Sequence, residues 1–131
     1  MARPASAWMN DELALFRKSV REFLQREFVP HQDRWRAQHR VDRETWQKAG
    51  HAGLLLADVP ETFGGGGGTF AHTAVVLEEL GRIGDSSFGS AVQDIVAHYL
   101  LAYGSDEQRR RWLPKMAAGE LVGALAMTEP G

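Results

Sequence analysis

The sequence has no cysteine, no strong charge imbalance and no long apolar run. The lack of cysteine excludes disulfides, thiolate metal sites and cysteine nucleophiles, so any redox chemistry requires a bound cofactor. With 15 basic and 17 acidic side chains, the net charge of −2 provides no attraction to nucleic acid or to an anionic membrane. No segment approaches the roughly 20 apolar residues of a membrane span, and residues 1–10 lack a signal-peptide pattern. We therefore expect a cytoplasmic protein without nucleic-acid or membrane partners.

Motifs for hydrolysis and metal binding are also missing. No serine lies in a Gly-x-Ser-x-Gly turn, which leaves nucleophilic hydrolysis without support. No two histidines are spaced i,i+4, and no cysteine joins them, so the sequence predicts no metal site. The adjacent carboxylates Glu78 and Glu79 point about 100 degrees apart on a helix and cannot share a proton, which indicates surface or salt-bridging groups.

Apolar residues recur at helical spacing in several segments that start with a capping residue. Pro30 should end the first of these helices near Val29. Ser105 and Gln108 have the spacing of a capping box, which predicts a last helix running to about Ala118. The expected N-caps are Asn10, Asp42, Thr69 and Ser105.

The segment from about Ser87 to Tyr103 has an apolar side that is too wide for a surface helix. We therefore expect it to be the central helix of the bundle. The residues on that side are Phe88, Val92, Ile95, Val96, Tyr99, Leu100 and Tyr103.

Five consecutive glycines, residues 64–68, interrupt the helical pattern. Their spacing does not match a dinucleotide fingerprint, and no Lys-Ser/Thr pair follows as in a phosphate-binding P-loop. A flexible connecting loop is the favoured interpretation, and a loop that moves over a ligand is the alternative.

After Gly119 the pattern changes to a short apolar segment, residues 122–127, followed by the turn residues 128–131. This segment is typical of a strand, yet nothing else in the chain could pair with it. The predicted fold class is all-α, an orthogonal or up-down bundle of five or six helices, with a short terminal strand that would lead into a missing β domain.

Several stretches of the sequence resemble, in their order and spacing, the N-terminal helical domain of the acyl-CoA dehydrogenase family. The two stretches nearest the C-terminus match best. The stretches are Phe16–Phe23 followed by Pro30, Gly53-Leu54 leading to Pro60–Gly65, Glu78–Arg82, Tyr103–Gln108, Trp112–Met116 with Gly119-Glu120, and Ala126–Gly131. The resemblance implies that residues 1–121 are the N-terminal helical domain and that residues 122–131 begin the family's middle β domain.

The resemblance also implies an activity. Members oxidise an acyl-CoA thioester to its 2,3-enoyl form, with a proton leaving C2 and a hydride passing from C3 to N5 of FAD. The implied partners are the acyl-CoA substrate, an electron acceptor such as electron-transferring flavoprotein, and further copies of the full-length chain in a dimer or tetramer.

Some residues can be carried over from the family. Leu125, Met127 and Thr128 match its first flavin-contacting positions, where a hydroxyl and main-chain amides can hydrogen-bond the flavin's pyrimidine edge. Leu125 replaces an aromatic residue found there in some members. The family's base, a glutamate, lies beyond Gly131, so no residue of this chain is expected to be catalytic.

The resemblance places one wall of the acyl pocket on the expected central helix, although the periodicity there favours plain core packing. The residues concerned are Phe88, Ala91, Val92 and Ile95. Two alternatives to a dehydrogenase stay open: an acyl-CoA oxidase or flavin monooxygenase of the same fold, and a truncated, non-enzymatic helical interaction module.

Overall fold

The computed structural model describes residues 6–131, which form six α-helices and two short 3-10 turns and no strand. The prediction of an all-α bundle of five or six helices is confirmed. Within the described residues, no helix is long and apolar enough to cross a membrane. The elements are α1 (Asp11–Glu27), η1 (Val29–His31), α2 (Gln32–Gln38), α3 (Arg43–His51), η2 (Glu61–Phe63), α4 (Phe70–Arg82), α5 (Ser90–Tyr103) and α6 (Asp106–Ala117).

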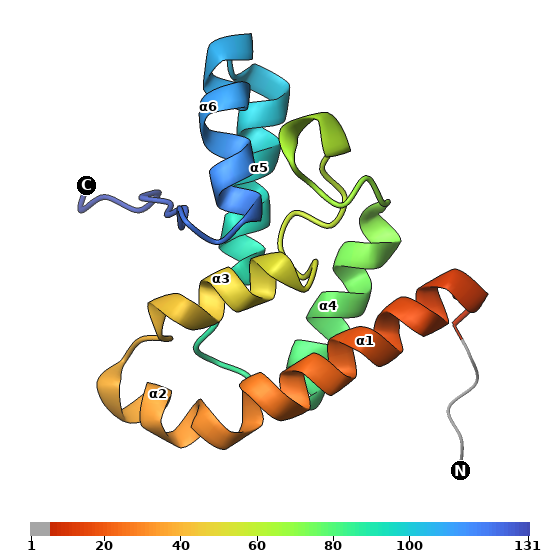
Figure 1. The fold of residues 1–131 in the computed structure, drawn as a ribbon. Helices are drawn as coiled ribbons and strands as arrows, with labels where there is room; N and C mark the ends of the chain where they lie inside the picture. Colours follow the sequence, from red (N-terminus) through yellow and green to blue (C-terminus); the bar gives the residue numbers. More distant parts are fainter. Residues whose placement is uncertain (1–5) are drawn as a thin grey trace.

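The helices form two packed pairs joined by short elements (Figure 1). α1 packs against α4, and α5 packs against α6, with α2 and α3 connecting the pairs. Aromatic rings fill the core between them, where Phe28 meets Trp35 edge-on at 5.2 Å and Phe88 edge-on at 4.9 Å between ring centroids. The ring centroid of Trp46 lies 4.3 Å from that of Phe88. Such geometry adds to the stabilisation from apolar burial alone.

Three of the four predicted N-caps make their capping bonds. Asn10 accepts a hydrogen bond from the N–H of Leu13 at 2.8 Å. Ser105 and Gln108 exchange two bonds, 3.2 and 2.9 Å long, and Thr69 caps α4 together with His72. These caps depend only on neighbours in the sequence, which is why local reasoning finds them.

Asp42 is the N-cap residue of α3, as predicted, but its carboxylate makes no capping bond. It accepts instead from both terminal nitrogens of Arg34, at 2.9 and 2.5 Å, and from Nε1 of Trp35 at 3.2 Å. A bidentate guanidinium is a stronger partner for a carboxylate than a backbone N–H.

Backbone hydrogen bonds hold the glycine run against the preceding segment, an arrangement that does not favour the predicted flexible connecting loop. Four successive amides, residues 65–68, donate to carbonyl groups in the segment 56–60 at 2.9–3.2 Å. A Cβ on Gly65 would lie only 2.2 Å from the carbonyl oxygen of Val59. Glycine is required in this run because its backbone touches the backbone of residues 56–60, and a side chain would prevent that contact.

The apolar side of α5, predicted to be buried, is buried only in part: Val96 and Leu100 pack against the core. The buried residues of this helix are Ser90, Gln93 and Ala97, which are small or polar. Ile95 and Tyr99 on the apolar side are 45% and 55% exposed. Helix α5 approaches α6 through these small and polar residues, and only the part of its apolar side with Ile95, Tyr99 and Tyr103 stays exposed.

The predicted strand at residues 122–127 is not formed. The segment has no regular secondary structure and extends away from the helices at the C-terminus (Figure 1). A strand needs a neighbour for its backbone hydrogen bonds, and the described residues offer none.

Candidate functional site

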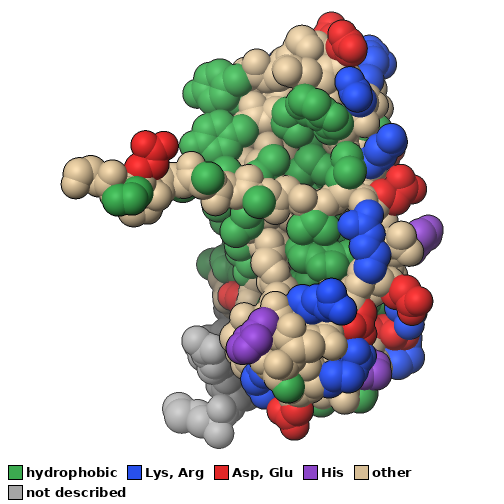
Figure 2. Space-filling view, turned by 90° about the vertical axis from the view of Figure 1, so that its left-hand side faces the viewer, with side chains coloured by type: hydrophobic (Ala, Val, Ile, Leu, Met, Phe, Trp, Pro, Cys, Tyr) green, Lys and Arg blue, Asp and Glu red, His purple; other side chains and the backbone are tan. Residues whose placement is uncertain are grey.

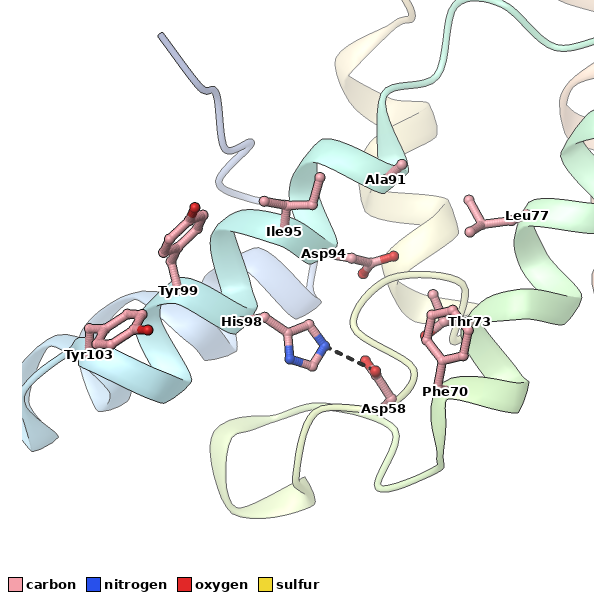
Figure 3. A pocket seen from close by; sticks show the side chains of 10 residues that line it. All are labelled: Asp58, Phe70, Thr73, Leu77, Ala91, Asp94, Ile95, His98, Tyr99 and Tyr103. Atoms are coloured by element: carbon pink, nitrogen blue, oxygen red, sulfur yellow. Dashed lines mark hydrogen bonds and ion pairs between the residues drawn. The ribbon is translucent and has the colours of Figure 1, made fainter. Parts of the chain in front are cut away.

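An apolar groove of about 710 Å³ lies between α4 and α5. Its walls carry large apolar side chains and its floor carries polar ones (Figure 3). The walls are Phe70 and Leu77 from α4 and Ala91, Ile95, Tyr99 and Tyr103 from α5, and the floor residues are Asp58, Thr73, Asp94 and His98.

Two of the four residues predicted for an acyl pocket line the groove, and two do not. Ala91 and Ile95 line the groove. Phe88 is 7% exposed and packs in the aromatic core, and Val92 is half-buried and does not line the groove. The reason is the start of α5 at Ser90, which leaves Phe88 on the preceding turn.

The floor of the groove joins a carboxylate–histidine pair to a second carboxylate. Nε2 of His98 lies 3.0 Å from Oδ2 of Asp58, whose side chain is 9% exposed (Figure 3). Asp94 lies beside this pair on α5. Burial, and then the charge of Asp58, raise the pKa of Asp94 to about 6, against the opposing pull of the Leu56 backbone N–H and of His98. The floor therefore holds a carboxyl group whose pKa is raised well above its usual value.

Sequence reasoning missed the floor residues and the α4 wall. Asp58 lies in the loop before the glycine run, and Phe70 and Thr73 lie on α4, so only the tertiary fold brings them to α5. One signal was available in the sequence: Asp94 is the single acidic residue within a mostly apolar helix.

The C-terminal tail carries the three residues predicted to contact a flavin. Leu125 and Met127 are 38% and 79% exposed, and Thr128 is exposed beside them. Within the described residues, the backbone amides after Gly123 have no partner. Extended backbone with free N–H groups and a free threonine hydroxyl fits the role of one edge of a flavin site.

Gln93 fixes the place where this tail begins. Its side chain is fully buried, and its Nε2 donates to the carbonyl groups of Met116 at 3.0 Å and Leu121 at 2.7 Å. Its Oε1 accepts from the N–H of Gly123 at 2.6 Å. Helix α5 therefore contributes to both the groove and the anchor of the tail.

The part of the chain that the structure describes holds no group of three or more His, Asp or Glu side chains that could bind a metal ion. Hydrophobic side chains gather on one face near the projecting tail, and charged side chains follow one edge of that face (Figure 2).

Comparison with known proteins identifies the family of the chain. Residues 10–120 match the family model for the acyl-CoA dehydrogenase N-terminal domain. The chain belongs to the acyl-CoA dehydrogenase family. It is 43% identical over 123 residues to the mitochondrial long-chain specific acyl-CoA dehydrogenase of Sus scrofa, an alignment covering 93% of this chain and 29% of that protein.

Solved structures of acyl-CoA dehydrogenases share the fold. The Geobacillus kaustophilus protein matches with a TM-score of 0.91 and 38% identity, over 96% of this chain and 33% of that one. A Bacillus anthracis member complexed with FAD matches with a TM-score of 0.76 and 29% identity, over 95% of this chain and 22% of that one. The chain therefore spans a third or less of the length of these relatives.

Proposed function

We propose that this chain is the N-terminal domain, residues 1–121 with the start of a β domain at residues 122–131, of an FAD-dependent acyl-CoA dehydrogenase. The reaction removes a proton from C2 and a hydride from C3 of an acyl-CoA thioester and leaves a 2,3-enoyl product. FAD, when bound, supplies the acceptor for that hydride. The family match over residues 10–120 is the observation that carries the proposal.

The groove between α4 and α5 is the proposed wall of the acyl site. Ala91 and Ile95, two of the four residues carried over from the family, line it together with aromatic side chains. An apolar wall of this kind favours the hydrocarbon part of the substrate and excludes water from it. Phe88 would support this wall from behind, through its contacts with Phe28 and Trp46.

The tail is the proposed edge of the flavin site. Main-chain amides near Leu125 and Met127, with the hydroxyl of Thr128, would hydrogen-bond the pyrimidine edge of the flavin and orient it. The base that takes the C2 proton is proposed to lie outside this chain. No carboxylate of the chain is assigned to that step.

Further partners belong to the same proposal. The relatives' names support acyl-CoA as substrate. An electron acceptor such as electron-transferring flavoprotein, a homo-oligomeric full-length enzyme and a cytoplasmic location complete it.

A chimera tests the function directly. Residues 6–131 would replace the matching segment of the Geobacillus kaustophilus enzyme, with which they share a TM-score of 0.91. We expect the chimera to bind FAD and to oxidise acyl-CoA thioesters when a dye accepts the electrons, with the enoyl product identified by mass spectrometry. Peroxide formed without the dye would favour the oxidase alternative. A flavin-loaded chimera that oxidises no acyl-CoA of 4 to 18 carbons would contradict the proposal.

A further inference from the structure

Gln93 is the largest polar side chain that the described fold buries completely. Both N–H groups of its amide donate to backbone carbonyls, those of Met116 and Leu121, and its oxygen accepts from the N–H of Gly123. Burying an amide is unfavourable unless its donors and its acceptor are all paired, as they are here. Two of the three bonds reach the tail, so the side chain fixes the tail against the helices.

A second contact holds the tail at the same place. A Cβ on Gly123 would lie only 3.0 Å from the Cβ of Val96. Val96 is three positions after Gln93 and therefore lies on the same side of α5, about one turn further along. The backbone of the tail thus rests directly on this helix at Gly123, where a side chain would push it away.

The bond to Gly123 is the last hydrogen bond that the tail makes within the described residues. The first proposed flavin contact, Leu125, follows two residues later and so lies within about 7 Å of Gly123 along the chain. No later hydrogen bond in the described tail corrects a displacement at Gly123. A shift there would therefore be passed on to residues 125–128.

Helix α5 also carries part of the proposed acyl wall, since Ala91 and Ile95 line the groove. Each is two positions from Gln93, and a step of two residues turns about 200° around a helix, so Gln93 points away from the groove. One helix therefore supports the acyl wall on one side and the tail on the other. Hydride transfer depends on how these two parts are placed, because reacting atoms must come within about 3–3.5 Å.

We propose that Gln93 is a positioning residue for hydride transfer: by holding the start of the tail against α5, it sets the place of the flavin edge relative to the acyl groove. Gly123 takes part because glycine lets the tail lie this close to Val96. Gln93 acts through the tail and touches neither substrate nor flavin. The inference rests on the proposed function, since it takes the groove as the acyl wall and the tail as the flavin edge.

Anaerobic stopped-flow reduction of the flavin in the Geobacillus kaustophilus chimera tests this role. Gln93→Met keeps the length of the side chain and removes its three hydrogen bonds. We expect the rate of reduction per bound flavin to fall about tenfold or more, with less than about a twofold change in acyl-CoA affinity. A residue that only stabilised the fold would lower the flavin content and leave that rate unchanged. Gln25→Met, at an exposed position of α1, is the matched control and should keep the parent rate.

A second pair of variants tests the same geometry with Gln93 intact. In Gly123→Ala the added methyl group would press on Val96 and move the tail off α5, so the rate per bound flavin should fall about threefold. Adding Val96→Ala makes room for the methyl group and should restore the rate. This pair decides the question if the Gln93→Met chimera holds no flavin.

Hydrogen exchange on the 131-residue chain gives a reading that needs no flavin. The amide proton of Gly123 should exchange about tenfold faster in Gln93→Met than in the parent, because its acceptor is gone, while Gln25→Met should match the parent. An unchanged exchange rate would overturn the inference.

The kinetic outcomes separate this inference from the proposed function. A Gln93→Met chimera that reduces its bound flavin within about twofold of the parent rate would overturn the positioning role and leave the dehydrogenase standing. A loss in Gly123→Ala that Val96→Ala does not relieve would do the same. If the parent chimera binds flavin and oxidises no acyl-CoA, the proposed function itself fails, and the inference with it.

Discussion

Arg21 on α1 holds Glu79 on α4 through two hydrogen bonds, from Nε at 2.9 Å and from Nη2 at 2.8 Å. The carboxylate is 4% exposed, and Arg82 and Arg17 lie 3.3 and 3.7 Å from it. The hydrogen bonds from Arg21 lower the pKa of Glu79, and the positive charges of the three arginines add to the effect. This cluster ties the two helices of one packed pair together.

Glu79→Gln should lower the free energy of unfolding by about 2 kcal/mol at pH 7, since it leaves partly buried guanidinium groups without their anion. The native pKa of Glu79 lies below its usual value of 4.5, so its stabilisation is present at neutral pH and is lost in acid. Urea unfolding at pH 7 and pH 3 measures this. Glu78→Gln, at a half-exposed position, should cost less than about 0.5 kcal/mol. Equal effects of the two variants would show that burial of Glu79 contributes nothing.

Gly65→Ala should destabilise the chain by about 3 kcal/mol or more, because the added methyl group would overlap the backbone of Val59. Hydrogen exchange should show the loop amides of residues 65–68 losing protection. Gly81→Ala is the control, since nothing lies within 4 Å of its Cβ position inside α4. That variant should gain about 0.5–1 kcal/mol from helix propensity. A neutral Gly65→Ala would mean that the loop is not held against residues 56–60.

Asp94 should make the chain less stable as the pH rises. Its native pKa of about 6 lies above the usual 3.8, so the folded chain binds the proton more tightly, and stability falls between about pH 4 and pH 6. Asp94→Asn should therefore be more stable than the parent at pH 7.5 by about 1 kcal/mol, after allowance for solvent screening. The difference should vanish at pH 3.5. Thermal unfolding across this range measures it, with Asp33→Asn as an exposed control that follows the parent.

Gln93→Leu should release the tail. The substitution keeps an apolar side chain in the buried space and removes all three bonds that Gln93 makes to residues 116, 121 and 123. We expect residues 121–131 to become mobile on the nanosecond timescale, with a loss of stability of about 2–3 kcal/mol. Backbone NMR relaxation detects the change. Relaxation rates equal to those of the parent would show that the tail is held by other contacts.

The 131-residue chain by itself should bind FAD weakly or not at all, because the tail offers only one edge of the proposed site. Absorbance near 450 nm after purification, and a titration with FAD, measure this. Stoichiometric flavin in the purified chain would contradict the expectation.

The sequence predicts the helices well because their signals are local. Asn10, Thr69 and Ser105 cap helices through residues two or three positions away, and those bonds form whatever the tertiary fold. Asp42 shows the limit of such reasoning, since Arg34 and Trp35 compete for its carboxylate once α2 and α3 come together.

The groove was predicted only in part because a helix has more than one side that can be buried. Periodicity identifies the apolar side of α5 but cannot tell whether core or solvent meets it. The most deeply buried residues of the helix are Ser90, Gln93 and Ala97. Asp94 could have been singled out as a charge beside Ile95, but its neighbours Asp58 and Thr73 are 36 and 21 positions away in the sequence.

The two walls of the groove differ in their connection to the C-terminal tail. The wall on α5 is continuous with Gln93 and so with the start of the tail, whereas the wall on α4 has no such connection. Substitutions at Phe70 and Leu77 can therefore widen or narrow the groove while the tail keeps its position. An engineer who wished to change the size of ligand accepted by this domain would leave α5 untouched and rebuild α4.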